Sequence, residues 1–162
     1  MNNARKAAVT ALCDVERSGS YSNLASGYAI SAGELSRQDA AFTTMLVYGV
    51  LQRKLTLDAV ISKYINGSFK KIHPFVLSVL RTGIYQLLFM DKVPMFAAVN
   101  ESVLLIRNSK QRFAVGFANA VLRKVAAEKD ELLQFIDSSD DPSVRYSCPE
   151  DIYDCLVKDH GK

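Results

Sequence analysis

The chain has 162 residues, of which 49% are hydrophobic and 23% are charged, and its formal net charge is +3. This length fits one domain with a sizeable core, and the hydrophobic content excludes a disordered chain. No apolar run approaches the roughly 20 residues of a membrane-spanning helix, and the first residues lack the apolar segment of a signal peptide, so we expect a cytoplasmic protein.

The net charge conceals an asymmetry along the chain. Residues 1–127 hold 16 Lys and Arg against 7 Asp and Glu, a net charge of +9, whereas residues 128–162 hold 4 against 10, a net charge of −6. A basic body suits a nucleic acid, because Lys and Arg at phosphates release counterions and supply most of the non-specific affinity. The alternative is a solvated surface whose charges balance overall.

The first predicted helix covers residues 4–17. Arg5 and Lys6 lie in its first turn, where free backbone amides and the helix dipole also attract anions. We expect both side chains to point away from the apolar face of this helix. The residues at helical spacing on that face are Ala8, Leu12 and Val15.

Further helical segments follow in the first half of the chain. A short helix is predicted over 22–32. Ser36-Arg37-Gln38-Asp39 matches the capping-box pattern, so a helix should begin there, pause around Arg53-Lys54 and resume over 57–65. Asn66-Gly67-Ser68 then predicts a loop.

Residues 74–90 are predicted to form the central helix of the fold. Ser78, Thr82 and Gln86 repeat at i+4 and make one narrow polar stripe on an otherwise apolar cylinder. A helix that is apolar nearly all round must be buried nearly all round. Gly83 should allow a neighbouring helix to approach closely.

Two more core helices are predicted after the central one. Pro94 opens the first of them, since proline has its backbone angle already set for a first helical turn. The second covers residues 112–127, with Phe113, Phe117 and Val121 repeating at i+4.

No active site stands out from the sequence. The eight glycines are scattered, without a Gly-x-Gly or P-loop pattern. His73 and His160 lie in unrelated contexts, and the cysteines form no Cys-x-x-Cys pair. We therefore expect this chain to contain no catalytic, cofactor-binding or metal-binding residues.

Residues 80–101, which contain Arg-Thr-Gly-Ile-Tyr-Gln-Leu-Leu, and residues 117–124, which contain Asn-Ala-Val-Leu-Arg, resemble the signature helices of the NusB family. The residues of these two segments are more similar to one branch, the NusB-like N-terminal domain of bacterial rRNA cytosine-5 methyltransferases of the RsmB/Sun type. The resemblance implies an all-α, NusB-like bundle of about seven helices in two packed halves, about 4–66 and 69–137, with a C-terminal helical tail.

The resemblance also implies that RNA binding and catalysis belong to two different domains. Residues 1–138 would be a NusB-like RNA-binding domain, and 139–162 would be a linker and the start of the missing methyltransferase part. The domain would position small-subunit rRNA for the absent catalytic domain, which would transfer a methyl group from S-adenosylmethionine to C5 of a cytosine. The implied partners are rRNA and the chain's own C-terminal methyltransferase domain, with no membrane, and the fragment alone should be inactive. The alternatives are a NusB-type transcription antitermination factor and a helical interaction module that does not bind RNA.

The candidate RNA-binding residues are basic. In NusB factors the N-terminal basic end is part of the RNA surface, which makes Arg5 and Lys6 the first candidates by resemblance. The full candidate set is Arg5, Lys6, Lys70, Lys71, Arg112, Arg123 and Lys124.

A second pattern lies in the last predicted core helix. The residues that fall within about 60° of one another on a helical wheel are Arg112, Gly116, Asn119 and Arg123. Two arginines that flank a small residue and an amide are suited to a phosphate. The alternative is structural: Asn119 satisfies a nearby loop backbone and Gly116 permits close helix packing.

Asn100 is expected to be a buried, hydrogen-bonded amide, since leaving it unsatisfied would cost about 1–3 kcal/mol.

Overall fold

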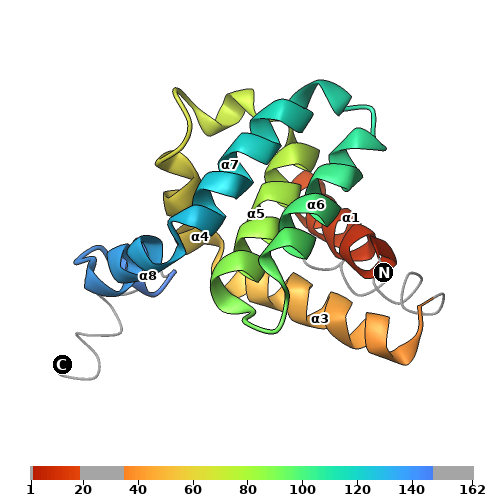
Figure 1. The fold of residues 1–162 in the computed structure, drawn as a ribbon, viewed down its shortest axis with the longest axis horizontal. Coiled ribbons are helices and arrows are strands. Elements are labelled where there is room, and N and C mark those ends of the chain that lie inside the picture. The colour runs from red at the N-terminus through yellow and green to blue at the C-terminus, as the bar shows by residue number, and fades with distance from the viewer. Residues whose placement is uncertain (1, 19–34, 148–162) are drawn as a thin grey trace.

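The computed structural model describes residues 2–18 and 35–147, which form helices joined by turns (Figure 1). No β-strand occurs in these two stretches, and the all-α fold class is confirmed. The elements in chain order are α1 Asn2–Ser18, α3 Arg37–Gln52, α4 Lys54–Ser62, the short 3-10 helix η1 Phe69–Lys71, α5 Pro74–Phe89, α6 Met95–Arg107, the 3-10 helix η2 Arg112–Ala114, α7 Val115–Ala127, α8 Lys129–Ser138 and α9 Pro142–Arg145. The helix predicted over 22–32 lies outside the described residues.

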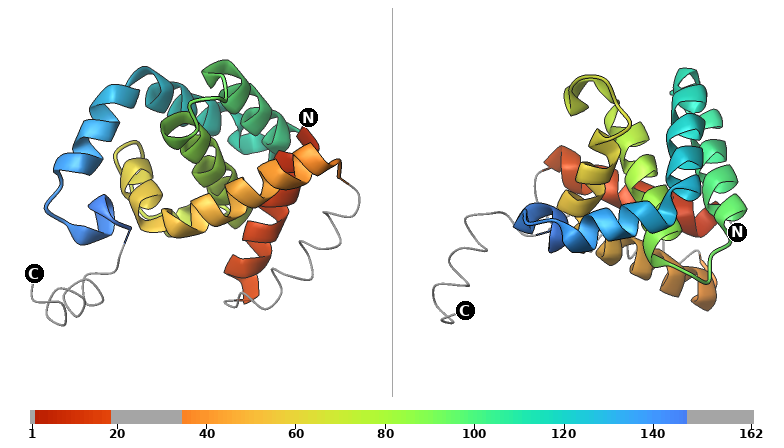
Figure 2. Two further views of the ribbon diagram at one scale, coloured as in Figure 1. Left: turned by 90° about the horizontal axis from the view of Figure 1, so that it is seen from below. Right: turned by 60° about the vertical axis from the view of Figure 1, so that its left-hand side comes forward.

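The helix α5 is the centre of the molecule, as its composition predicted. It contacts α1, α3 and α4 on one side and α6 and α7 on the other (Figure 1; Figure 2). Its buried residues include both the apolar positions and the predicted polar stripe of Ser78, Thr82 and Gln86. Burial on all sides is the condition that an apolar cylinder requires.

The polar stripe is satisfied largely within the core. The Thr82 hydroxyl donates to the carbonyl oxygen of Ser78 at 2.8 Å, and the Gln86 amide donates to the carbonyl oxygen of Thr82 at 3.0 Å. The side-chain oxygen of Gln86 accepts a hydrogen bond from Nε of Arg5 in α1 at 2.8 Å. The stripe therefore joins α5 to α1.

Arg81 is a buried cation of α5 itself, and it is held by carboxylates. Its guanidinium donates to both carboxylate oxygens of Asp58 in α4, at 2.7 and 3.0 Å, and to Glu16 in α1 at 3.2 Å. Lys54 also pairs with Glu16. A buried guanidinium needs such partners, because an unpaired buried charge is strongly destabilising.

Two glycines mark the closest helix contacts. A Cβ atom at Gly83 would lie 2.9 Å from both the Leu122 side chain of α7 and the Ser102 hydroxyl of α6, so the predicted close approach is confirmed. A Cβ at Gly49 of α3 would overlap the Tyr85 ring of α5. The glycine at position 83 thus brings α6 and α7 against the same stretch of α5.

Several predicted boundaries are confirmed. The Ser36 hydroxyl accepts a hydrogen bond from the Asp39 backbone amide at 3.1 Å and caps α3. The helix breaks at Arg53, whose guanidinium lies 4.0 Å from the centre of the Phe89 ring. The next helix, α4, covers Lys54–Ser62, so it begins and ends three residues before the predicted range of 57–65. The loop at 66–68 contains Gly67, whose φ of 118° suits glycine.

The segment after residue 127 packs back on the body. Leu132 and Ile136 of α8 are buried. After the turn at 139–141, α9 lies on α4, where the Thr56 hydroxyl donates to the Val144 carbonyl oxygen at 2.7 Å. The Ser147 hydroxyl accepts a hydrogen bond from the Leu55 backbone amide at 2.9 Å, at the first turn of α4. None of the helices in the described part of the chain is long and apolar enough to cross a membrane.

Candidate nucleic-acid interface

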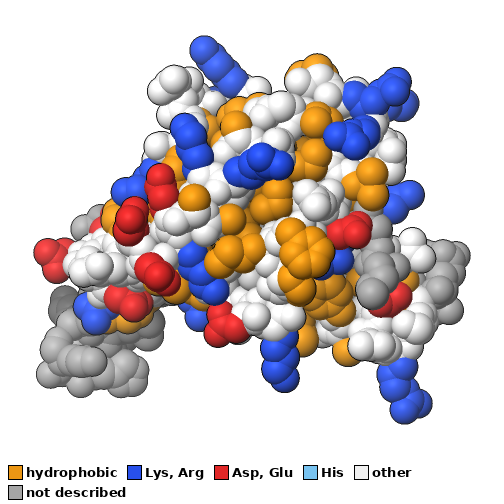
Figure 3. Space-filling view, viewed as in Figure 1, with side chains coloured by type: hydrophobic (Ala, Val, Ile, Leu, Met, Phe, Trp, Pro, Cys, Tyr) orange, Lys and Arg blue, Asp and Glu red, His pale blue; other side chains and the backbone are white. Residues whose placement is uncertain are grey.

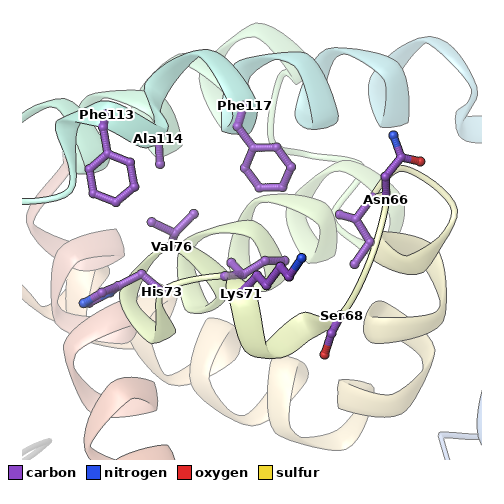
Figure 4. Close-up of a pocket in the computed structure, with 10 residues that line it drawn as sticks. Asn66, Ser68, Lys71, His73, Val76, Phe113, Ala114 and Phe117 are labelled. Atoms are coloured by element: carbon purple, nitrogen blue, oxygen red, sulfur yellow. The ribbon is translucent and has the colours of Figure 1, made fainter.

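Two exposed phenylalanines line a pocket between α7 and the segment that leads into α5. Phe113 in η2 is 80% exposed, and Phe117 in α7 is 37% exposed. Both rings project from their helices toward Val76 and Lys71 (Figure 4). The pocket, of about 260 Å³, is called the aromatic pocket below, and its lining residues are Ile65, Asn66, Ser68, Lys71, Ile72, His73, Val76, Phe113, Ala114 and Phe117.

The exposure of these rings corrects the interpretation of the helix predicted over 112–127. The first turn of that segment is the 3-10 helix η2, and α7 begins only at Val115. A 3-10 turn has three residues rather than 3.6, so Phe113 leaves the i+4 register on which its alignment with Val121 depended. The residues of α7 that face the core are Ala118, Val121, Leu122 and Val125.

A second concavity runs between α6 and α7. It has a volume of about 420 Å³ and is called the α6–α7 groove below. Its lining residues are Asn100, Glu101, Val103, Leu104, Arg107, Val115, Gly116, Asn119 and Arg123. Three members of the predicted wheel cluster therefore meet in one groove, whereas Arg112 lies in η2 and does not line it.

Three structural expectations about residues that line this groove are wrong. Asn100 is exposed rather than buried, because it lies on the outer side of α6 while Val99 and Val103 face inward. Gly116 permits no close packing, since a Cβ added to it would meet no heavy atom within 4 Å. The Asn119 side chain makes no hydrogen bond to the loop backbone or to any other described residue. The contributions of Asn100, Glu101 and Arg107 to this groove were not anticipated from the sequence.

The candidate cations have different surroundings. Lys6, Lys70, Lys71, Arg112, Arg123 and Lys124 are all exposed. Lys71 lines the aromatic pocket, whereas its neighbour Lys70 lines a separate hollow of about 710 Å³ beside α1 and the start of α5. The structure thus distributes these six side chains over several faces, and their contact with RNA stays a prediction.

Arg5 is buried, and the expectation that it points away from the core is wrong. Its residue is only 6% exposed, its Nε donates to Gln86, and its guanidinium carbon lies 5.1 Å from the centre of the Phe42 ring. Burial lowers the pKa of this guanidinium, and the nearby Glu101 carboxylate opposes the shift. A side chain in this position acts in packing α1 against α3 and α5, and only Lys6 of the N-terminal pair reaches the solvent.

The described residues show no arrangement of side chains for covalent or metal chemistry. They contain no group of three or more His, Cys, Asp or Glu that would hold a metal ion. Cys13 is half-buried, and burial raises the pKa of its thiol, which disfavours the reactive thiolate. Cys148 and Cys155 lie outside the described residues.

Comparisons with known proteins assign the chain a family. The model of the NusB family matches residues 2–127. The "Probable ribosomal RNA small subunit methyltransferase B" of Bacillus subtilis is 34% identical over 155 residues, which are 96% of this chain and 34% of that protein. A protein of the same name from Synechocystis is 31% identical over 163 residues, covering 100% of this chain and 36% of its own length.

Free-standing relatives are also similar. The "Transcription antitermination protein NusB" of a Nocardioides species is 32% identical over 130 residues, which are 80% of this chain and 95% of that protein. The chain therefore spans about a third of the length of the two methyltransferases and nearly all of the antitermination protein.

Proposed function

Because this chain belongs to the NusB family, we propose that it is the RNA-binding module of an S-adenosylmethionine-dependent rRNA methyltransferase. In this proposal the module positions small-subunit rRNA for a catalytic domain that carries the cofactor, and it acts in the cytoplasm. The expected partners are rRNA and that catalytic domain.

The observation that carries the RNA-binding part is the aromatic pocket. Exposed aromatic rings beside cations are the usual platform for single-stranded RNA, because every base has a π-face and every linkage has a phosphate. Phe113 and Phe117 provide the rings, and Lys71 provides a cation in the same pocket. Lys124 lies about 20° from Phe117 around α7 and extends the same face by two turns.

The extent of the similarity favours the methyltransferase branch. The match to the two methyltransferases covers 96% and 100% of this chain, and so includes α8 and α9, whereas the match to the Nocardioides antitermination protein covers 80%. A NusB-type antitermination factor is the second candidate, because that protein is matched over 95% of its own length. A reading frame that continues past Lys162 into a cofactor-binding domain is the expected result, and a stop codon there would favour the antitermination factor.

The RNA-binding proposal is tested with labelled single-stranded fragments of small-subunit rRNA and fluorescence anisotropy. Phe117→Ala should weaken binding by about 1–3 kcal/mol, the usual value of one stacked base. Phe96→Ala is the matched control, because Phe96 is 70% exposed but lies on α6, outside the aromatic pocket. Equal affinities of the wild type and the Phe117→Ala variant would remove the pocket from the RNA surface. A wild-type chain that fails to bind any rRNA fragment would favour the interaction module.

A further inference from the structure

The α6–α7 groove presents unused hydrogen-bonding groups. The side chains of Asn100, Arg107, Asn119 and Arg123 make no hydrogen bond or ion pair with any residue that the structure describes. Elsewhere in the same part of the chain, the buried cation Arg81 is paired with carboxylates. Four polar side chains that converge on one concavity without mutual bonds are available to a polar ligand.

We propose that the α6–α7 groove binds one nucleotide of single-stranded RNA. Arg107 and Arg123 hold the phosphate, and the amides of Asn100 and Asn119 bond to the polar edge of the base. The inference rests on the proposed RNA-binding function and deepens it by naming a second site and the chemistry that it recognises.

The size and charge of the groove fit this ligand. Its volume of about 420 Å³ lies within the roughly 300–1,000 Å³ of small-molecule sites. Guanidinium groups bind phosphate oxygens bidentately, and side-chain amides donate to and accept from base edges. Glu101 also lines the groove, and a carboxylate there accepts from an exocyclic base amine, a donor that an acidic side chain of a peptide lacks. The groove therefore suits a nucleotide better than a carboxylate-bearing segment of a protein.

The groove also adjoins the aromatic pocket across α7. Both are borne by α7, which lies between α6 on one side and the segment that carries Lys71 on the other (Figure 1). Gly116 and Arg123 lie about 100° around the helix from Phe117 and Lys124, so the two faces adjoin. A single strand that crosses α7 passes from one site to the other, with consecutive nucleotides in each.

Gly116 allows the groove to be filled without disturbing the fold. A Cβ at this exposed position meets no heavy atom within 4 Å, and glycine is a poor helix former, so larger residues are tolerated. Gly116→Leu should fill the groove and weaken the binding of a short single-stranded RNA about tenfold. Gly116→Ala is the matched control, which should bind within about twofold of the wild type. Both variants should melt at or above the wild-type temperature.

A second pair of variants tests the phosphate contact. Arg107→Ala should weaken binding about tenfold and reduce the slope of log K against log salt by about 0.7, the value of one contact on a single strand. Lys92→Ala removes an exposed cation from the turn between α5 and α6, outside the groove, and should leave that slope unchanged.

Three results would overturn the inference, and they differ in what they leave standing. If Gly116→Leu and Arg107→Ala bind like the wild type while Phe117→Ala binds weakly, the groove is not a nucleotide site and the proposed function survives. If a poly-glutamate peptide binds the chain and is lost in both groove variants, the groove belongs to an acidic protein segment. If the wild type binds no RNA, the inference fails together with the proposed function.

Discussion

The Arg5 side chain connects α1 to the centre of the molecule. Its Nε donates to the side-chain oxygen of Gln86, and its guanidinium lies against the Phe42 ring, so the cation links α1, α3 and α5. Such an arrangement stabilises through packing of the long side chain as well as through its charge. The loss of this one residue therefore affects three helices.

We expect Arg5→Ala to lower the free energy of unfolding by about 1–3 kcal/mol, because the buried oxygen of Gln86 loses its donor. Lys6→Ala is the control from the next position, and as an exposed residue it should change stability by less than about 0.5 kcal/mol. Urea unfolding followed by circular dichroism measures both. Equal stabilities of the two variants would contradict a structural role for Arg5.

Glu16 makes the stability of the folded protein depend on pH in the acid range. Burial alone would raise the pKa of this carboxyl, but the hydrogen bond to Lys54 and the charges of Lys54 and Arg81 outweigh burial and hold the pKa below its ordinary value of 4.5. A carboxyl with a lowered pKa binds fewer protons when folded, so its contribution is present above pH 4.5 and is lost as the pH falls through the lowered pKa.

The Glu16→Gln variant should therefore show a smaller fall in melting temperature between neutral and acid pH than the wild type. At neutral pH it should be less stable than the wild type, since Arg81 loses one of its two carboxylate partners. Thermal melts across a pH series below 5 measure this difference. Parallel curves for the two proteins would show that Glu16 has no linked protonation.

At the scale of the element, the contact between α3 and α5 depends on one missing methyl group. A Cβ at Gly49 would overlap the Tyr85 ring, which is a rigid group rather than the flexible end of a side chain. Gly49→Ala should therefore destabilise the protein by roughly 1–3 kcal/mol, the usual cost of overpacking.

The effect of Gly49→Ala on stability should change sign when the Tyr85 ring is removed. In a Tyr85→Ala background, Gly49→Ala should stabilise by about 0.5–1 kcal/mol, because alanine is the better helix former and no ring opposes it. A double-mutant cycle from urea unfolding gives the coupling directly. Additive effects of the two substitutions would mean that α3 does not meet α5 at this point.

Helices were predictable from the sequence where composition alone decides burial. The segment over 74–90 is apolar on nearly every side, so its central position followed before any contact was known. Phe113 was misjudged because periodicity assumes one continuous α-helix, and the 3-10 turn of η2 changes the register between it and the core. Phe117 lies within α7 but outside the set of α7 residues that are buried, and spacing alone did not place it at that edge. The identity of the neighbour across a groove, such as α6 beside α7, depends on tertiary packing that spacing does not encode.

Packing, rather than charge, determines which of the candidate basic side chains is exposed. Arg5 and Lys6 are adjacent and chemically similar, yet one is buried and the other is exposed. The difference arises because Arg5 lies on the same side of α1 as the buried Ala4, Ala8 and Leu12 and meets a free oxygen on α5. The sequence of α1 alone could not reveal that oxygen, which lies 81 positions further along the chain.

At the scale of the whole molecule, the charges are segregated. Acidic side chains gather at the end of the molecule that carries α8, while Lys and Arg are spread over the remainder of the face that Figure 3 shows. A strand of RNA that follows the body should therefore avoid that end.

The salt dependence of RNA binding should reflect this distribution. If all six exposed candidate cations contact phosphates, log K falls with log salt at a slope of about −4 on single strands. Lys6→Ala should reduce the magnitude of that slope by about 0.7, whereas Arg5→Ala should leave it unchanged because Arg5 does not reach the solvent. Anisotropy titrations over a salt series give both slopes. A lower slope in a still-folded Arg5→Ala variant would return Arg5 to the RNA surface.

The cap on α4 fixes an order of events during synthesis. The hydroxyl that accepts from the Leu55 amide belongs to Ser147, 92 positions later, and Arg53 supplies no side-chain cap of its own. A ribosome that adds roughly 5–20 residues per second needs about 5–18 s to make that span. For this interval the first turn of α4 has emerged without its acceptor, so its amides are among the last in the nascent chain to become protected from exchange with water.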